Sequence, residues 1–507
     1  MTVLPQRRSA LLAAALVLSL VLTGCSTLQQ SGVEPHQGWP GSQNASADSP
    51  KTSAGQAGQL GQAPSAAGAV SDRSVSVPVE QTRSAMAVPA KPANIMLRVQ
   101  RGFAMPELPS KLVDTHIKRF LNKPDYLERV FDRGGRYLHH IVEEVEARGL
   151  PTELALLPIV ESAFNPQATS SAKAAGLWQF IPSTGRVFNL SQNWWMDERR
   201  DIIESTRAAL DYLQKIYAQQ GNDWFLALAS YNWGEGAVSR AIKRNKARKK
   251  PTDYLSLKMP KETRHYVPQL IALRNLLRDP EKYGLRLPYV EDRPYFAVID
   301  KNQSIDLALA AELAELEMNE FKALNPHLHR PVITVSQTSR IILPVENIQT
   351  YNDNLNKWLA TGLPLVTWRP YTLKKGDTLD KLAKAAGISP MELAKANGLK
   401  SPKTGLLPGS SILAPVAVQS HDPGIETTLA RFSGAKTIER VHLPAKIYRV
   451  RKSDTLAKIA RRFGVSTAQI RKLNKLSGDI KTGMRLIIRP SERKVLVTDA
   501  QGRRSYQ

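Results

Sequence analysis

Glu161 is the residue of this sequence with the clearest capacity for chemistry. It ends an apolar run, residues 156–160, and Ser162 follows it directly. An apolar setting raises the pKa of a carboxyl group because it disfavours the charged form. A carboxyl group that stays protonated near neutral pH is the proton donor that cleavage of a glycosidic bond requires. The sequence therefore predicts that Glu161 acts as a general acid.

Most glycosidases use two carboxylates, and the sequence offers no convincing partner for Glu161. Glu153 lies two helical turns earlier, roughly 12 Å away along a helix axis. Glu235 lies between two glycines and has the reach to enter a cleft. Four carboxylates stand among arginines, which indicates solvated ion pairs: Asp197, Glu198, Asp201 and Asp211. A mechanism with a single carboxyl group fits this set best.

The segments around Glu161 are predicted to be helical. Residues 124–149 carry apolar side chains at three- and four-residue spacing, with a predicted break or kink at Gly134 and Gly135. Pro151 suits the first turn of the next helix. Three later segments are also predicted to be helical: 202–219, 224–231 and 266–277. No alternating β pattern appears, so residues 101–290 are expected to form one mainly α domain.

Three separated motifs in this region resemble those of lytic transglycosylases with a goose-lysozyme-like fold. Glu161 stands at the position of that family's catalytic acid, and residues 176–182 match its Gly-Leu-aromatic-Gln motif. Residues 230–236 match its Tyr-Asn motif, although Trp233 replaces a small residue and leaves the shape of that subsite open. Residues 262–267 resemble a later Glu-Thr-x-x-Tyr motif.

The resemblance implies a reaction and a set of contacts. Glu161 is expected to protonate the oxygen between N-acetylmuramic acid and N-acetylglucosamine in peptidoglycan. As a base it then takes a proton from the muramic acid 6-hydroxyl, which closes a 1,6-anhydro ring. The expected substrate-binding residues are Ser162, Ser170, Gly176, Leu177, Trp178, Gln179, Phe180, Tyr231, Asn232 and Tyr266. Core packing for Trp178, a polar helix end for Ser162 and a turn cap for Asn232 remain alternatives.

Two other functions remain open at this point: a hydrolytic muramidase of the same fold, which would use water, and a non-catalytic peptidoglycan-binding lipoprotein. The intact motifs argue against the second. The nine histidines show no metal-ligand spacing and no phosphate-binding glycine loop is present. Neither a metal nor a cofactor is therefore expected.

The C-terminal third contains an internal repeat. Residues 371–383 match residues 448–460, each with an Asp-Thr-Leu signature, and each copy closes with an apolar strand. The pairs Asp377-Thr378 and Asp454-Thr455 in these signatures fall where a helix N-cap is wanted. The copies resemble LysM domains, which implies binding of glycans that contain N-acetylglucosamine. A degenerate third copy begins at Phe296 and lacks Asp-Thr.

The N-terminus predicts export and lipidation. Arg7 and Arg8 precede an apolar stretch that ends in Leu-Thr-Gly-Cys25, as in a secretory signal, and this ending resembles a bacterial lipoprotein signal. Cys25 would then carry lipid and anchor the chain. Ser26, where inner-membrane lipoproteins carry Asp, indicates the outer membrane of a Gram-negative envelope, facing the periplasm. As the sole cysteine, Cys25 leaves no intrachain disulfide.

The charge is concentrated at the C-terminus. The chain carries +25 overall, and residues 366–507 hold 28 Lys and Arg against 10 Asp and Glu. Such a surface suits a polyanion or simply remains solvated. Export argues against nucleic acid, so peptidoglycan strands and membrane lipid are the expected partners, and the sequence identifies no protein partner.

Taken together, the sequence predicts a multidomain protein, a mainly α lysozyme-like catalytic domain followed by small βααβ LysM domains. The expected parts are a signal peptide (1–25), a low-complexity tether (26–100), the transglycosylase domain (101–290), the degenerate LysM-like unit (291–350) and two LysM domains (367–417 and 446–491).

Overall fold

The computed structural model describes residues 93–415 and 422–507 of the chain. Cys25, the predicted signal peptide and most of the predicted tether lie outside the described residues. None of the helices in these two ranges combines the length and the apolar composition needed to cross a membrane.

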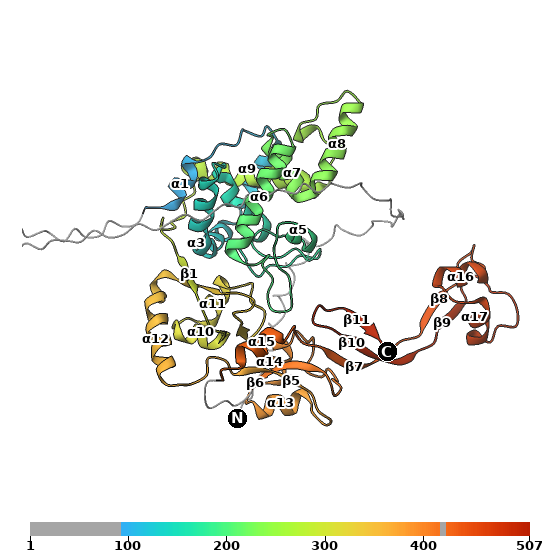
Figure 1. Ribbon diagram of the computed structural model, residues 1–507. Helices are drawn as coiled ribbons and strands as arrows, with labels where there is room; N and C mark the ends of the chain where they lie inside the picture. Colours follow the sequence, from blue (N-terminus) through green and yellow to red (C-terminus); the bar gives the residue numbers. More distant parts are fainter. Residues whose placement is uncertain (1–92, 416–421) are drawn as a thin grey trace, which may run out of the picture. The chain divides into compact units, whose positions relative to one another are not determined.

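The first part of the described chain is helical, as predicted (Figure 1). Its α-helices are α1 (Ile95–Arg101), α2 (Lys111–Leu121), α3 (Pro124–Ala147), α4 (Leu157–Ser162), α5 (Pro182–Val187), α6 (Ile202–Gln219), α7 (Trp224–Trp233), α8 (Glu235–Ala247) and α9 (Lys261–Arg278). Three 3₁₀ turns accompany them: Thr152–Leu156, Tyr254–Ser256 and Glu281–Tyr283. Asp201 and Asp223 begin α6 and α7, where each side chain accepts two backbone N–H bonds from the first turn.

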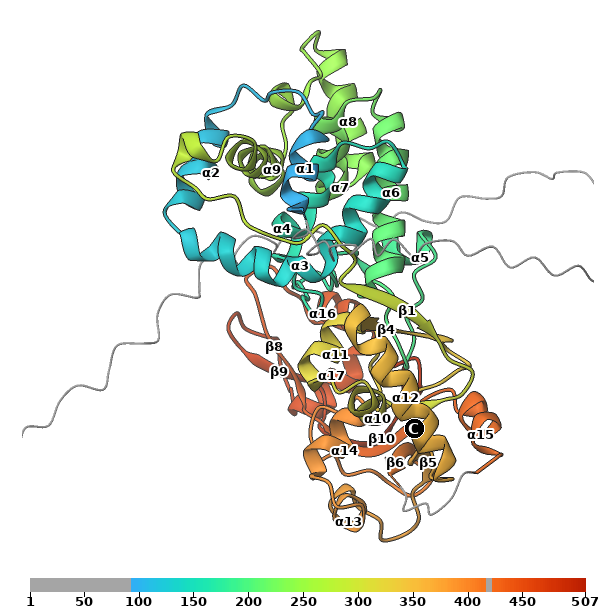
Figure 2. The ribbon, with the colours of Figure 1, turned by 90° about the vertical axis from the view of Figure 1, so that its left-hand side faces the viewer.

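Helix α9 is the centre of this helical part. Its residues 270–273 are fully buried, and α2, α4, α7 and α1 pack against it. Figure 2 looks close to the axis of α9 and shows α1 and α2 beside it. Because four helices surround α9, its residues are fixed relative to both the Glu161 segment and the Tyr-Asn motif.

The break predicted at Gly134 and Gly135 is wrong, because α3 runs unbroken through both residues. Gly134 instead permits close packing. A Cβ atom there would lie 2.5 Å from Cδ2 of Phe164, whose ring is fully buried. A Cβ on Gly135 would meet its nearest neighbour at an ordinary 3.7 Å. The glycine at 134 therefore makes room for the residues that follow Glu161.

The degenerate copy has the predicted strand–helix–helix–strand order. Strands β1 (Phe296–Asp300) and β4 (Arg340–Pro344) pair antiparallel around α10 (Leu307–Leu313) and α11 (Met318–Leu324). A second short pair, β2 (Ile305–Asp306) with β3 (Val332–Ile333), and the helix α12 (Ile348–Ala360) are additions. This copy keeps its own apolar core around Phe321, Ile341 and Leu343.

The two clear repeats also have the βααβ order. The first consists of β5 (Trp368–Thr372), α13 (Leu379–Ala385), α14 (Pro390–Ala396) and β6 (Ser411–Pro415). The second consists of β8 (Lys446–Arg449), α16 (Leu456–Phe463), α17 (Thr467–Asn474) and β9 (Arg485–Arg489). In both, the threonine of the predicted Asp-Thr pair is the helix N-cap, because the side chains of Thr378 and Thr455 accept the backbone hydrogen bond. Asp377 and Asp454 each accept a tyrosine hydroxyl and a backbone N–H.

One asparagine recurs in all three copies, buried in the first two and partly buried in the third. Asn325, Asn397 and Asn474 each donate to a carbonyl one turn earlier. Each also exchanges two hydrogen bonds of 2.6–2.9 Å with one residue of the closing strand. The degenerate copy thus keeps this link between helix and strand although it has lost the Asp-Thr signature.

A three-stranded sheet was not predicted. Strand β10 (Glu492–Thr498) pairs with β7 (Thr437–Leu443) on one side and β11 (Arg504–Tyr506) on the other. The short helix α15 (Ile425–Arg431) precedes β7 in the chain. The second LysM copy lies between β7 and β10 in sequence, so the sheet joins segments on both sides of a complete small domain.

Candidate functional site

Glu161 lies in the last turn of α4, and the chain turns sharply directly after it. Ala163 and Phe164 adopt φ angles of 51° and 55°, which are uncommon for residues other than glycine. The Glu161 side chain is partly exposed, and Oε1 accepts a short hydrogen bond from the hydroxyl of Tyr266 on α9. The sharp turn and α9 together hold the carboxyl group in place.

The electrostatic setting of Glu161 suits a proton donor. Burial raises its pKa, the hydrogen bond from Tyr266 lowers it, and the negative charge of Glu262 raises it, with a result of about 7. Burial also raises the pKa of Tyr231 and Tyr266 well above the usual tyrosine value, so both remain neutral O–H groups. At neutral pH the carboxyl group is thus present in both the protonated and the ionised form.

Residues 176–180 form a tight turn beside the acid. Gly176 has a φ angle of 84°, and a Cβ atom there would lie 2.0 Å from the carbonyl oxygen of Arg199, so only glycine fits. The side chains of Leu177, Trp178 and Phe180 are buried, and Trp178 Nε1 donates to Thr206. Their side chains therefore pack in the core and support the turn. Trp178 thus lies where the alternative of core packing places it.

Gln179 and Tyr231, unlike these three core residues, are partly exposed. Gln179 is partly exposed, has a φ angle of 50°, and donates from Nε2 to the Gly176 carbonyl. Its side-chain oxygen has no hydrogen bond to the described residues, so the amide can still bind a sugar. The Tyr231 hydroxyl donates to the Trp178 carbonyl at 2.9 Å, which joins α7 to the turn.

The remaining predicted residues have local partners. The Ser162 hydroxyl contacts the carbonyl oxygens of Pro158 and Leu177. Ser170 is exposed and accepts from the Ala174 N–H.

Asn232 joins α7 to α9, and does not cap a turn. It accepts from the Thr263 hydroxyl at 2.7 Å and donates to Glu262 at 3.4 Å. The structure thus brings the Glu161 segment, the 176–180 turn, α7 and α9 together. Ser170 lies in the exposed hairpin that precedes the turn.

The other carboxylates considered as partners of Glu161 are held elsewhere. Glu153 is fully buried and accepts from the N–H groups of Ala104 and Met105 at 3.1 and 2.9 Å. Glu235 accepts from the Tyr212 hydroxyl at 2.8 Å and pairs with a lysine. Both therefore have structural partners, and neither is free to act with Glu161.

The prediction of solvated ion pairs is wrong for Asp197 and Asp201, which are buried. Asp201 caps α6. Asp197 forms a two-point ion pair with Arg199, which also donates to the Phe180 carbonyl at 3.0 Å. This pair therefore braces the 176–180 turn. Glu262 and Arg199 are the functional neighbours that sequence reasoning missed, although Glu262 was visible in the Glu-Thr-x-x-Tyr motif.

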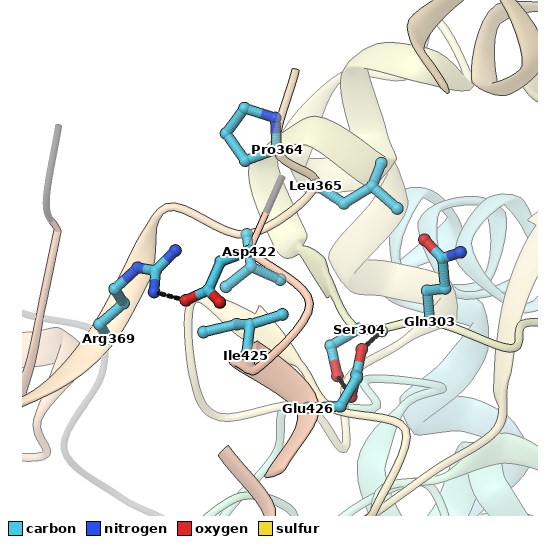
Figure 3. Close-up of a pocket in the computed structure, with 9 residues that line it drawn as sticks. Gln303, Ser304, Pro364, Leu365, Arg369, Asp422, Ile425 and Glu426 are labelled. Carbon is cyan, nitrogen blue, oxygen red and sulfur yellow. Dashed lines mark hydrogen bonds and ion pairs between the residues drawn. The ribbon is translucent and has the colours of Figure 1, made fainter. Parts of the chain in front are cut away.

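A small enclosed pocket lies outside the helical part (Figure 3). Its lining includes Ser304, Leu365 and Ile425, together with the Ser304–Glu426 hydrogen bonds and the Arg369–Asp422 ion pair. It offers about 10 Å³, which is room for a single water, so it is no sugar site. In residues 93–415 and 422–507 no cluster of His, Cys, Asp or Glu side chains has the arrangement of a metal site.

Three family models match the chain. A transglycosylase SLT domain matches residues 141–253, the LysM-like domain of lytic transglycosylase MltD matches 295–359, and LysM domains match 371–415 and 448–489. Membrane-bound lytic murein transglycosylase D of Escherichia coli (strain K12) is 35% identical over 380 residues, which are 73% of this chain and 80% of that relative. The chain belongs to the family of membrane-bound lytic murein transglycosylase D.

The protein is therefore an enzyme, a lytic transglycosylase that acts on peptidoglycan, and the predicted family and fold class are confirmed. More distant similarity is local. The soluble lytic murein transglycosylase of Escherichia coli (strain K12) is 29% identical over 116 residues, 22% of this chain and 18% of the relative. The solved lytic transglycosylase Slt of Pseudomonas aeruginosa is 22% identical over 30% of this chain and 26% of that one, with a TM-score of 0.22.

Proposed function

We propose that the enzyme cleaves the β-1,4 bond between N-acetylmuramic acid and N-acetylglucosamine and leaves 1,6-anhydromuramic ends. The observation that carries this proposal is a single carboxyl group, Glu161, held by the Tyr266 hydroxyl, while Glu153 and Glu235 have other partners. Burial raises the pKa of Glu161 to about 7. A carboxyl group with this pKa gives up and regains a proton near neutral pH with little cost in either direction.

A single carboxyl group is sufficient for both proton transfers of this reaction. The Glu161 carboxyl group donates its proton to the bridging oxygen as the bond from that oxygen to the anomeric carbon breaks. The muramic acid 6-hydroxyl then bonds to the anomeric carbon, and its proton passes to the Glu161 carboxylate. The acid is restored and no water is consumed. Tyr266 holds the carboxylate oxygen between these two steps.

We assign the substrate contacts around this carboxyl group to the predicted residues that the structure leaves accessible. Gln179 presents its amide to a sugar, and the exposed Ser170 is assigned to the muramic acid 6-hydroxyl. Gly176 is buried, and the Arg199 carbonyl fills the space beside its Cα, so its role is to shape the turn. Tyr231 and Asn232 position the turn and α9. The buried side chains of residues 177, 178 and 180 support these contacts from beneath.

The remaining parts keep the enzyme on its substrate. The two LysM copies bind glycan strands of peptidoglycan, and their basic surface suits its acidic groups. Lipid on Cys25 anchors the chain to the outer membrane on its periplasmic side. The Leu-Thr-Gly-Cys sequence, Ser26 and the name of the membrane-bound relative support this location. Incorporation of labelled fatty acid that is lost in Cys25→Ser tests the anchor.

The test of the acid compares two matched variants on purified peptidoglycan. Glu161→Gln should lower the rate of muropeptide release by about 10²- to 10⁴-fold, the usual worth of a general acid. Glu235→Gln, which removes the same charge from a residue held by Tyr212, should keep the rate. Pull-down on insoluble peptidoglycan should be equal for both. Full activity of Glu161→Gln, or loss in Glu235→Gln alone, would refute the assignment.

A further inference from the structure

A groove of about 470 Å³ opens at the C-terminal end of α7, where Trp233 lines it. We call it the basic groove, and its lining residues are Trp233, Arg244, Arg248, Lys258, Met259 and Pro260. Trp233 and Met259 pack against the main core and form its apolar floor. Three cations therefore surround an apolar surface.

The three cations have no carboxylate partner. Arg244, Arg248 and Lys258 are exposed and form no ion pair with any residue in 93–415 or 422–507. Arg148 and Arg207, two other arginines of the helical part, each pair with a carboxylate. The C-terminal dipole of α8 favours a cation at Arg244 and Arg248, but Lys258 lies on a separate segment. The convergence of the three charges therefore points to an external anion.

The walls of the basic groove are held by hydrogen bonds. Asn245 on α8 donates to the carbonyls of Pro251 and Ser256 at 2.8 and 3.0 Å. The Tyr254 hydroxyl donates to the Thr263 carbonyl at 2.8 Å. These bonds fix the segment that carries Lys258 to both α8 and α9, so a ligand would not have to order the groove.

The basic groove is built on the ends of α7 and α9, the two helices that also carry Tyr231 and Tyr266. Trp233 follows Tyr231 by two residues on α7, and Pro260 precedes Tyr266 by six residues, roughly 9 Å along a helix axis. Three residues of extended peptide span roughly 10 Å. A short peptide attached to a sugar bound at Glu161 therefore has the length to reach the groove.

We propose that the basic groove binds the carboxylates of the peptide substituents on the glycan strand that is being cut. This inference rests on the proposed function, because muramic acid is the sugar of that substrate that carries short peptides with free carboxylates. The arginines and the lysine pair with the carboxylates, and the indole of Trp233 covers the methyl groups of the peptide. The enzyme should then cut peptide-bearing strands faster than strands whose peptides lack charge.

The experiment uses the full chain and three substrates. These are intact peptidoglycan strands, the same strands with their carboxylates converted to neutral amides, and strands stripped of peptide by an amidase. The native protein is compared with the triple variant Arg244→Gln, Arg248→Gln, Lys258→Gln. The matched control is Lys243→Gln, Lys246→Gln, Lys249→Gln, which removes the same charge from exposed lysines that do not line the groove. Circular dichroism verifies that all three proteins melt alike.

For the native protein we expect kcat/KM to be roughly tenfold higher on intact than on amidated strands, the effect of two exposed ion pairs. The ratio should fall towards 1 in the groove variant and persist in the control. A ratio of 1 in the native protein, or a tenfold ratio retained by the groove variant, would overturn the proposal while cleavage itself continued. No product from any of the three substrates would instead overturn the proposed function.

A second measurement needs no variant. Raising the ionic strength from 0.01 M to 0.15 M shortens the Debye length from about 30 Å to about 8 Å, so the native ratio of intact to amidated strands should decrease with salt. A ratio that does not change with salt would refute binding through the exposed cations.

Discussion

The substitution Tyr266→Phe tests the account of the acid most sharply. It removes the hydroxyl that donates to Glu161 and leaves the buried ring in place. The lost hydrogen bond stabilised the ionised form, so its loss raises the pKa of Glu161 above about 7. A hydrogen bond to a charged group is worth about 1.5–3 kcal/mol, and 1.36 kcal/mol corresponds to one pH unit. The expected displacement is about one to two pH units.

The assay is the pH profile of kcat/KM on peptidoglycan, which reports the ionisation of the free enzyme. Because Glu161 must be protonated to act as the acid, activity falls as the pH rises through its pKa. In Tyr266→Phe this alkaline limb should move to higher pH, whatever happens to the maximum rate. A limb that stays in place or moves to lower pH would refute the reasoning.

The substitution Glu262→Gln provides the opposite control. The negative charge of Glu262 raises the pKa of Glu161, so its removal should move the alkaline limb to lower pH. The displacement should be smaller than for Tyr266→Phe and should shrink as salt is added, because Glu262 is exposed. The structure requires that the alkaline limb move in opposite directions in the Tyr266→Phe and Glu262→Gln variants.

Three further predictions concern stability. Gly134→Ala should lower the melting temperature because its Cβ atom meets the Phe164 ring at 2.5 Å, whereas Gly135→Ala should raise stability by about 0.5–1 kcal/mol. Because the pKa of Glu161 is about 7 in the folded protein and about 4.3 in the unfolded chain, the folded state loses stability as the pH rises between these values. Glu161→Gln should therefore be more stable than the native protein by up to about 4 kcal/mol at pH 8. The two should be equally stable at pH 4, as measured by urea unfolding. Asn474→Ala should destabilise the second LysM copy by about 2–3 kcal/mol, measured by hydrogen exchange of that copy.

The sequence predicted what local patterns determine. The structure has the helices predicted at 202–219 and 224–231 with little change in their bounds, although their N-caps, Asp201 and Asp223, were not predicted. The βααβ order of the repeats followed from the duplicated Asp-Thr-Leu signature. The residues of the three motifs were placed near Glu161 because the family resemblance carried information about three-dimensional proximity.

The sequence did not predict what tertiary contacts determine. A break was predicted at Gly134 because the sequence does not distinguish a glycine that ends a helix from one that makes room for a ring distant in sequence, here that of Phe164. Asp197 was predicted to be solvated because the neighbouring sequence does not show that its partner Arg199 points inward and hydrogen-bonds to the 176–180 turn. The β7–β10–β11 sheet was missed because its strands lie on either side of a complete LysM copy. The basic groove combines α7, α8 and the segment before α9, which no single pattern connects.

The central claim, that Glu161 acts as both acid and base without water, is tested most directly by mass spectrometry of muropeptides released in water enriched in heavy oxygen. The account predicts products lighter than the hydrolytic ones by one water, with no heavy oxygen at the muramic acid end. Products of hydrolytic mass that carry heavy oxygen at the anomeric carbon would contradict it and identify the enzyme as a hydrolase.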